Sequence, residues 1–320
     1  MRLVCETSDI VLRPSIATIG FFDGVHRGHR YLIEQVCEVA AMRGLASAVI
    51  TFPIHPRQVM CSDYHPALLT TCDEKISLLA ETGIDYCMML DFTPEVARLS
   101  ARQFMAVLKE RYLIEVLVIG YDHRFGHNRS EGFDDYVRYG KELGIEVLLA
   151  HAYYYNKEKT GSTVSSSLIR HLLLKGNVSA AAEYLGYGFF LGGTVVGGYQ
   201  VGRKIGFPTA NLRVDSPDKI IPSDGVYAVY VSLDGMRYGG MLSIGYRPTL
   251  ANGTDRSIEV NIFHFDADIY DRPMQVSFVR YMRPEQKFNT VEELIARIRR
   301  DEEEINSVLS MSTSSIRQER

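Results

Sequence analysis

Two hydrophobic patterns divide this chain of 320 residues, and the first extends from residue 15 to residue 150. In that part, short apolar runs alternate with segments whose apolar residues recur at helical spacing. The predicted strands are Ser15–Gly20, Ala46–Phe52, Ile84–Leu90, Glu115–Gly120 and Ile145–Ala150. Helical segments are predicted near residues 29–42, 73–82, 100–111 and 131–142. Apolar strands separated by helices predict an α/β fold with a doubly wound, Rossmann-like parallel sheet.

After residue 186 the pattern changes to alternating apolar and polar positions between glycine-rich turns. This alternation predicts an antiparallel sheet or β-barrel. The clearest alternating segments are Val226–Val231, Ile258–Ile262 and Met274–Phe278.

Helices flank this second part of the chain. Ser166–Gly186 has a helical pattern and is expected to join the two parts. A last helix is predicted from Thr290, because Glu293 three residues later completes a capping box. We therefore expect an α/β domain at 1–182, a β-barrel domain with its C-terminal helix at 183–310, and a polar tail at 311–320.

Composition and charge narrow the function classes. Hydrophobic residues make up 46% of the chain, which is enough for two ordinary cores. The net charge is −4 and the basic residues form no evident stripe, which disfavours nucleic acid as a partner. Five cysteines without a Cys-x-x-Cys pair indicate neither a disulfide framework nor a zinc site. The chain has no 18-residue apolar run and no secretion signal, so we expect a soluble cytoplasmic protein without a membrane partner.

A pair of histidines marks the first candidate site. His26 and His29 flank Gly28 at the point where the first predicted strand gives way to a helix. Asp23 and Gly24 predict a tight turn before them. Because the amino end of a helix presents free amides and a positive dipole, this position suits phosphate. The imidazoles are able to donate hydrogen bonds to phosphoryl oxygens, although a short pattern of this kind also arises by chance.

Three further segments follow predicted strands or open a helix, and each also has an ordinary structural reading. Thr51–Arg57 offers His55 and Arg57 on a loop held by prolines, and an ordinary surface loop is the alternative. The other two segments are Gly120–Gly126, which contains Asp122, His123 and Arg124, and Val164–Arg170, which contains three serines and Arg170. Asp122 and the serines are also natural loop and helix caps.

A second candidate site lies in Gly202–Asn211, which packs glycines, basic residues, Pro208 and two oxygen-bearing side chains together. Thr209 and Asn211 are two residues apart on an extended segment, so both face one side, as a Mg²⁺ site requires. Glycines at 192–198 and at 202 are expected to form turns that admit phosphates. The alternative is a plain barrel corner.

A candidate base follows from the strand Ile258–Ile262. Its apolar residues occupy one face, which leaves Glu259 and Asn261 on the other. A carboxylate on a rigid strand is able to take a proton from a substrate hydroxyl during phosphoryl transfer. From this strand alone, a solvated glutamate is the alternative.

In order and spacing, these segments resemble the bacterial bifunctional riboflavin kinase/FAD synthetase family. The resemblance covers nearly the whole chain before the polar tail. Its first half rests on Ile19–His29, Thr51–Arg57, Gly120–Gly126 and Ser165–Arg170. Its second half rests on Gly206–Asn211, Gly225–Ala228, Ile244–Thr249, Ile258–Val260 and Asp268–Asp271.

For the first domain, the resemblance implies transfer of AMP from ATP to FMN, which gives FAD and pyrophosphate, with Mg²⁺ bridging phosphates. His26 and His29 are then the catalytic residues. The residues implied to bind ATP are Gly20, Phe21, Asp23, Gly28, Asp122, Ser166 and Arg170, and those implied to bind the flavin are His55, Pro56 and Arg124. Phe21 departs from the family, since many members have a small polar residue there.

For the second domain, the resemblance implies phosphorylation of riboflavin to FMN by ATP. Thr209 and Asn211 are implied to hold Mg²⁺ and ATP together with Gly202 and Lys204, and Glu259 to activate the terminal ribityl hydroxyl. The implied small-molecule partners are riboflavin, FMN, FAD and ATP. The aromatic residue that stacks on the flavin stays open among Tyr246, Phe263 and Tyr281, and the sequence does not give the oligomeric state.

Three other functions stay open at this level. The chain is alternatively a single-activity nucleotidyltransferase with a regulatory barrel, a flavin- or nucleotide-binding regulator that has lost catalysis, or a barrel that binds single-stranded nucleic acid. The complete Gly206–Asn211 segment disfavours the single-activity enzyme. The regulator is disfavoured because the chain retains all five residues that such a protein could lose, namely His26, His29, Thr209, Asn211 and Glu259. Net acidity disfavours the third.

Overall fold

The chain forms two compact units, Met1–Ser166 and Ser167–Arg320, which are described separately below. The computed structural model describes residues 1–5, 10–61, 63–120, 123–155, 164–198, 201–246 and 256–318, without the side chains of 128, 201, 204 and 312–318. Among the helices in these ranges, none is long and apolar enough to cross a membrane.

The first unit is built on a parallel sheet of six strands in the order β1-β4-β3-β2-β5-β6. The strands are β1 (Arg2–Val4), β2 (Ser15–Ile19), β3 (Ala46–Thr51), β4 (Tyr86–Met89), β5 (Ile114–Ile119) and β6 (Glu146–Leu149). Every residue of β2 and β3 is buried, as expected for central strands covered on both faces. The predicted α/β class and its five predicted strands are thereby confirmed.

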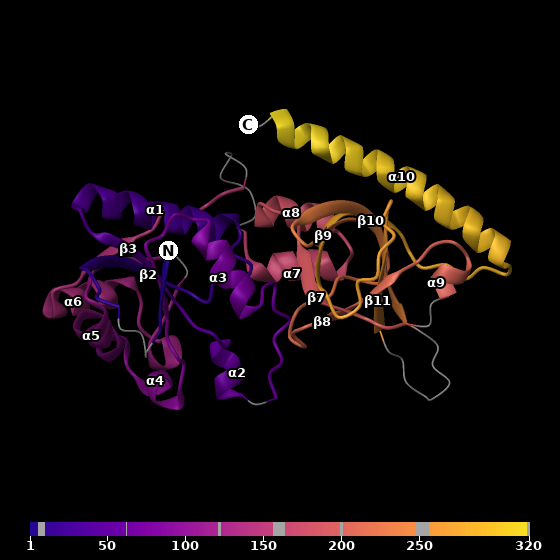
Figure 1. Ribbon diagram of the computed structural model, residues 1–320. Coiled ribbons are helices and arrows are strands. Elements are labelled where there is room, and N and C mark those ends of the chain that lie inside the picture. Colours follow the sequence, from indigo (N-terminus) through magenta and orange to yellow (C-terminus); the bar gives the residue numbers. More distant parts are fainter. Residues whose placement is uncertain are drawn as a thin grey trace. The chain divides into compact units, whose positions relative to one another are not determined.

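Helices cover both faces of this sheet (Figure 1). The larger ones are α1 (Arg27–Arg43), α3 (Cys72–Ala80), α5 (Ala101–Tyr112) and α6 (Phe133–Leu143). From β2 the chain first proceeds outward through β3 and β4, and then returns to β5 on the other side of β2. Such a reversal opens a crevice at the carboxyl ends of the two central strands, where ligands of open α/β sheets bind. The loops after β2 and β5 therefore meet at the expected place for a site.

Short elements escaped prediction in this unit. The strand β1 has three residues, and the helices α2 (Pro56–Met60) and α4 (Pro94–Arg98) have five each. Both helices begin with proline at the first helical position, which is where proline is tolerated. The expectation of an extended Thr51–Arg57 loop was therefore wrong from Pro56 onward. A 3₁₀ turn, η1 (His127–Arg129), follows the loop after β5.

The second unit is a closed barrel in the order β10-β11-β8-β7-β12-β9, which confirms the predicted architecture. Its strands are β7 (Phe190–Val196), β8 (Ala210–Val214), β9 (Gly225–Leu233), β10 (Met236–Tyr246), β11 (Arg256–Ile262) and β12 (Pro273–Arg283). The strand β7 corrects one expectation, because Gly192 and Gly193 lie within it rather than in a turn. A Cβ atom on Gly193 would stand 2.2 Å from the carbonyl oxygen of Arg213 on β8, so the close strand contact requires glycine there.

The described helices that belong wholly or mostly to the second unit differ from the expectation in two places. The helices are α7 (Ser166–Leu174), α8 (Val178–Leu185), α9 (Val201–Lys204) and α10 (Val291–Gln318). The predicted Ser166–Gly186 helix is split at Gly176, which has a φ of 75°. Helix α10 continues through most of the segment expected as a polar tail, since propagation of a formed helix is easier than its start. The predicted 182/183 boundary stays a prediction, and the two compact units divide after Ser166.

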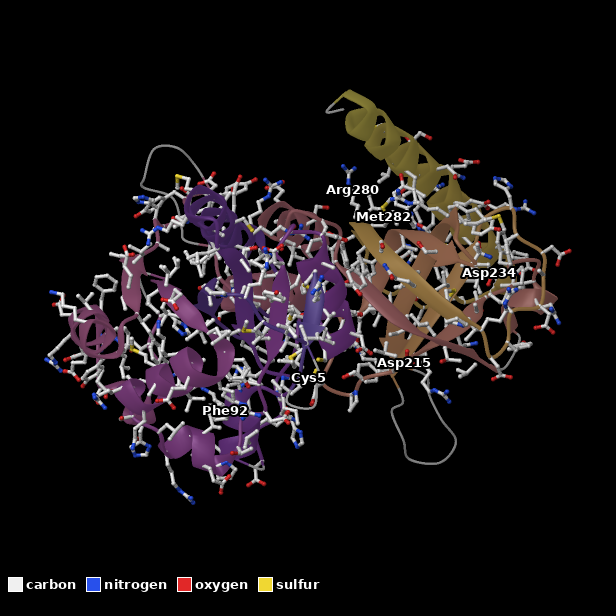
Figure 2. All side chains as sticks on the ribbon, turned by 60° about the vertical axis from the view of Figure 1, so that its left-hand side comes forward. Cys5, Phe92, Asp215, Asp234, Arg280 and Met282 are labelled. Atoms are coloured by element: carbon white, nitrogen blue, oxygen red, sulfur yellow. The ribbon has the colours of Figure 1, made fainter. Side chains whose placement is uncertain are left out.

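Helix α10 packs on the barrel through a small apolar cluster and a buried charge network. Ile305 and Leu309 contact Ala228 and Phe263, and Figure 2 shows Met282 and Arg280 of β12 on the side of the barrel that faces the helix. Asp301 is fully buried and accepts hydrogen bonds from Arg283 of β12. Its other oxygen lies 2.7 Å from Nη2 of Arg297, one turn earlier in α10.

Replacing Asp301 by alanine should destabilise the second unit by about 3–5 kcal/mol, because two largely buried guanidinium groups lose their partner. Urea unfolding of the whole chain, followed by circular dichroism, measures this as an earlier transition. Glu304→Ala is the matched control, since that carboxylate is 3.9 Å from Arg297 and half exposed, and should cost at most about 1 kcal/mol. Equal effects of the two substitutions would contradict the assignment of Asp301.

Candidate active sites

The first candidate site is built around the two histidines at the start of α1. His26 is the N-cap of the helix, and its Nδ1 accepts a hydrogen bond from the backbone N–H of His29 at 3.3 Å. The rings of the two histidines stack, with centroids 3.6 Å apart and an angle of 14° between their planes. Since Nδ1 of His26 is an acceptor, a neutral His26 carries its proton on Nε2, where it is able to donate to a ligand.

His29 is held in its uncharged form. Its pKa is lowered well below the ordinary value, first by burial and then by the electrostatic effect of His26 and Lys75 nearby. The ring packs edge-on against Phe22, with centroids 5.2 Å apart. Its Nδ1 is buried and has no hydrogen-bond partner among the described residues, although buried polar atoms are normally paired. An unpaired imidazole nitrogen at the amino end of a helix marks a place where a ligand group completes the site.

A cavity of about 240 Å³ opens beside these histidines. Its walls include His26, Gly28 and His29 from the start of α1, and Gly120 from the loop after β5. A Cβ on Gly28 would lie 3.3 Å from the His26 ring, so a side chain there would crowd the histidine and narrow the cavity. The cavity therefore joins the loops after β2 and β5, as the sheet topology requires.

Three predicted ATP-binding residues near this cavity are engaged with the protein itself. The buried carboxylate of Asp23 accepts hydrogen bonds from the backbone N–H groups of Leu69 and Thr70. Ser166 also lines the cavity, and its hydroxyl donates to the carbonyl oxygen of Asp23 at 2.9 Å. Gly20 donates its N–H to the carbonyl oxygen of Ile50. Asp23 thus shapes the turn before the histidines, and its predicted contact with ATP stays a prediction.

A second cavity of the first unit, of about 100 Å³, is lined by aliphatic, aromatic and basic residues. Pro56 and Arg124, two of the three predicted flavin-binding residues, both lie in its wall. The third, His55, caps α2 and packs edge-on against Phe21, with ring centroids 4.7 Å apart. The aromatic side chains of this cavity are Phe52, Phe92, Phe104, His123 and Phe125. A planar ring system fits such a wall.

Three predicted ATP-binding residues have not been placed so far, namely Asp122 and Arg170 of the first site and Lys204 of the second. Asp122 lies outside the described residues. Arg170 is half-buried in α7, in the second compact unit. Lys204 is the last residue of α9, and its side chain also lies outside the described part.

The second candidate site is assembled by the pairing of β8 with β11. Glu259 of β11 is the register partner of Asn211 of β8. The hydroxyl of Thr209 donates to Oε2 of Glu259 at 3.1 Å. Asn261 is turned to the same loop, and its Nδ2 donates to the carbonyl oxygen of Pro208 at 2.8 Å. The predicted trio of Thr209, Asn211 and Glu259 is therefore brought together by the strands.

Glycines make room for this trio. A Cβ on Gly198 would stand 2.1 Å from Nδ2 of Asn211. A Cβ on Gly202 would stand 2.3 Å from the carbonyl oxygen of Phe207 and 3.4 Å from Oγ1 of Thr209. A cavity of about 360 Å³ adjoins them, with Thr209 and Arg203 in its wall opposite the segment 265–270. The glycines thus keep the backbone close to the oxygen-bearing side chains, next to a volume of ligand size.

Sequence analysis missed one carboxylate of this region. Glu285, just after β12, accepts a hydrogen bond from the hydroxyl of Ser243 at 3.2 Å, and Ser243 is the register partner of Glu259. The pKa of Glu285 is raised by burial and by the neighbouring carboxylates of Asp224 and Glu259. Only the pairing of β10 with β11 brings Glu285 close to the trio, and no local motif signals it.

Among the three aromatic residues left open for the flavin, Phe263 is buried in the cluster beneath α10. Tyr281 packs against Tyr227, and Tyr246 is 56% exposed at the end of β10. Phe263 is therefore unavailable for stacking, while the other two stay candidates.

Two different protein-family models match this chain, one in each of its two parts. The family model described as FAD synthetase matches residues 9–164, and the one described as riboflavin kinase matches residues 185–309. A protein of Listeria monocytogenes named bifunctional riboflavin kinase/FMN adenylyltransferase is 36% identical over 290 residues, 90% of each chain. The protein of the same name from Escherichia coli is 37% identical over 307 residues, 94% of this chain and 96% of its own.

Among solved structures, the crystal structure titled macrolide-efflux protein from Streptococcus pneumoniae matches with a TM-score of 0.84 and 32% sequence identity. It covers 94% of this chain and 97% of its own. That title names a different activity from the two curated relatives, and the match establishes the shared fold over almost the full length. On the identity and coverage of the relatives, this chain belongs to the bifunctional riboflavin kinase/FMN adenylyltransferase family.

Proposed function

We propose that this chain converts riboflavin to FAD in two ATP-dependent steps, one in each compact unit. The barrel unit transfers the terminal phosphoryl group of ATP to riboflavin, which gives FMN and ADP. The α/β unit then transfers AMP from a second ATP to FMN, which gives FAD and pyrophosphate. Family membership supports both activities. The observation that supports the assignment is that each unit brings its own cluster of candidate phosphate-binding residues together beside its own cavity.

In the α/β unit, the triphosphate of ATP is proposed to occupy the cavity beside His26 and His29. A phosphate oxygen of FMN attacks the α-phosphorus, the bond between that phosphorus and the bridging oxygen breaks, and pyrophosphate leaves. Charge grows on the phosphoryl oxygens during this step. The imidazole N–H groups and the free amides at the start of α1 stabilise that charge. Ser166 is proposed as a further phosphate contact and Asp122 as a further ATP contact of this unit, while the ATP contact of Arg170 stays a prediction.

The aromatic cavity of the same unit is the proposed site of the flavin ring. Its wall contains the predicted flavin-binding residues Pro56 and Arg124 next to Phe52 and Phe125. The ring would then stack among aromatic side chains, while the exposed guanidinium of Arg124 is available to the FMN phosphate. His55 precedes the wall residue Pro56 and packs edge-on against Phe21.

In the barrel unit, Glu259 is the proposed general base. Its carboxylate takes the proton of the terminal ribityl hydroxyl, the oxygen attacks the γ-phosphorus of ATP, and ADP leaves. The hydrogen bond from Thr209 fixes the orientation of this carboxylate on the strand. Gly202 and Lys204, at the loop of α9, are proposed to approach the phosphates.

The oxygen donors of Thr209 and Asn211 fit a magnesium ion. Within the described residues there is no group of three or more acidic, histidine or cysteine side chains placed to hold a metal. Mg²⁺ bound through one or two protein oxygens and substrate phosphates needs no such group. The ion would supply charge neutralisation of the β- and γ-phosphates when bound.

We also propose the cytoplasm as the location of the protein. Cys37, Cys61, Cys72 and Cys87 carry free thiols, and structural disulfides are typical of oxidising compartments.

Incubating the purified chain with riboflavin, ATP and Mg²⁺ and separating the flavins by chromatography tests the proposal. FMN should appear first and FAD after it. FAD formation from supplied FMN without any phosphorylation of riboflavin would instead favour a single-activity nucleotidyltransferase, and neither product would overturn both assignments.

Replacing Gly198 by alanine should weaken the kinase step, because the new methyl group would displace the amide of Asn211. We expect the KM for ATP in riboflavin phosphorylation to rise roughly tenfold, equal to the loss of one good contact. Gly197→Ala is the matched control, since a Cβ there meets nothing within 4 Å. Steady-state kinetics of both variants decides the matter, and equal KM values would show that Asn211 does not contact the nucleotide.

A further inference from the structure

Lys75 is a buried cation that the proposed reactions do not use. It lies in α3 on the same helix face as the buried residues Leu78 and Leu79, and its exposed fraction is only 2%. A lysine is rarely buried to this extent unless its ammonium group has partners. Its position in the helix therefore aims a positive charge into the first unit.

The partners of this ammonium group are two backbone carbonyls at the ends of neighbouring strands. Nζ donates to the carbonyl oxygen of Phe52 at 2.7 Å and to that of Phe21 at 3.2 Å. Phe21 follows β2 and Phe52 follows β3, and these two strands are parallel neighbours in the sheet. Thr51 of β3 strengthens the same link, because its hydroxyl also donates to the carbonyl oxygen of Phe21 at 3.2 Å.

The two loops joined in this way carry different ligands in the proposed function. The loop that contains Phe21 leads to His26 and His29, beside the ATP cavity. The loop that contains Phe52 leads to His55 and Pro56, beside the flavin cavity, and Phe52 itself lines that cavity.

The side chain of Phe21 contacts both Lys75 and His55. Its ring lies 4.2 Å from Nζ of Lys75 on one side and packs edge-on against His55 on the other.

We propose that Lys75 is a positioning residue for adenylyl transfer, which fixes the ATP loop against the flavin loop so that the FMN phosphate faces the α-phosphorus. This rests on the proposed function of the first unit. Two reactants held by separate loops lose rate steeply when the loops shift, even where each loop still binds its own ligand. Loss of Lys75 should therefore lower kcat much more than it weakens binding of either substrate.

The charge state of Lys75 adds a second readout. Burial lowers the pKa of Lys75 to about 8. The titratable groups around it are Asp23 from the loop after β2, His29 from α1, Cys72 from its own helix and Cys87 from β4. The pKa of both thiols is raised, to about 12 for Cys87, and that of His29 is lowered, so these three stay neutral near pH 8. Among Lys75, His29, Cys72 and Cys87, it is therefore Lys75 whose charge changes near pH 8.

Deprotonation of Lys75 does not act by unfolding the unit. Above pH 8 the folded state releases this proton while the unfolded lysine, with its ordinary pKa of 10.5, retains it. The unfolded state then binds more protons, so this group makes the folded state more stable as pH rises from 8 to 10.5. A fall of adenylyl transfer in that window therefore reports the loss of the charged hydrogen bonds to the two loops.

The test compares the unmodified chain, Lys75→Met and Lys75→Arg from pH 6.5 to 9.5. We expect kcat for FAD formation in the unmodified chain to fall severalfold above pH 8. Lys75→Met should lower kcat at pH 7 about a hundredfold and abolish the pH dependence, while the separate Kd values of FMN and ATP, measured by calorimetry, change less than about threefold. Lys75→Arg keeps its charge throughout this range, so its residual activity should show no alkaline fall.

Riboflavin phosphorylation by the same samples is the internal control and should be equal in all three proteins. A kcat of the unmodified chain that stays constant to pH 9.5 would overturn the proposal without any variant, even if Lys75→Met does not fold. A Lys75→Met loss that appears wholly as weaker substrate binding would also overturn it. Absence of FAD formation in the unmodified chain would instead refute the proposed function of the unit.

Discussion

Replacing Glu259 by glutamine should reduce riboflavin phosphorylation by about a hundredfold to ten-thousandfold, the usual contribution of a general base. Glutamine keeps the size of the side chain and still accepts the hydrogen bond from Thr209. The substitution therefore removes basicity while preserving the packing between β8 and β11. The measurement is the rate of FMN formation from riboflavin at saturating ATP.

Two controls accompany this variant. Conversion of supplied FMN to FAD by the same protein should be unchanged, because that step belongs to the other unit. Glu303→Gln makes the same chemical change at an exposed position of α10 and should leave both rates as they are. If Glu259→Gln lowers both steps equally, the proposed division of labour between the units is wrong.

Replacing His29 by alanine should reduce FAD formation from FMN by about a hundredfold to a thousandfold, the cost of removing one donor aimed at developing charge. His29 is suited to this role because its buried Nδ1 has no partner within the described structure. The rate of FAD formation at saturating FMN and ATP is the quantity to measure.

Arg27→Ala is the matched control for the histidine. Arg27 lies between the two histidines in the sequence, but its side chain is exposed. Its loss should leave FAD formation within a few-fold of the unmodified rate. Riboflavin phosphorylation should be unaffected in both variants, and a His29→Ala protein that still makes FAD at a near-normal rate would refute the role of the histidine.

The sequence was sufficient to predict which side chains lie together where those side chains are close in the chain. His26 and His29 are close because one turn of helix separates them, and the strand before them ends at the crevice of the sheet. The Thr209 and Asn211 pair is equally local, since an extended segment turns residues two apart to the same side. Spacing alone therefore predicted which side chains lie together, while their contact with phosphate stays a prediction.

Features that depend on contacts between distant segments were not predictable in the same way. Glu259 was predicted only as a strand glutamate, and the register of β8 against β11 places it beside Thr209. Lys75 stands in a helical pattern where a lysine is ordinarily assigned to the solvent side. Its burial follows from the carbonyls of Phe21 and Phe52, which lie 54 and 23 residues away in the chain.

Mixing the two single-step variants tests most directly whether the chain contains two independent ATP sites. The His29→Ala and Glu259→Gln proteins are combined with riboflavin, ATP and Mg²⁺, and the flavins are separated over time. Our account predicts that each protein alone forms FAD from riboflavin at least about a hundredfold more slowly than the unmodified chain, that His29→Ala accumulates FMN, and that the mixture produces FAD after a lag. A mixture that forms no FAD, together with a Glu259→Gln protein that fails to convert supplied FMN, would show that the residues serve a single shared site.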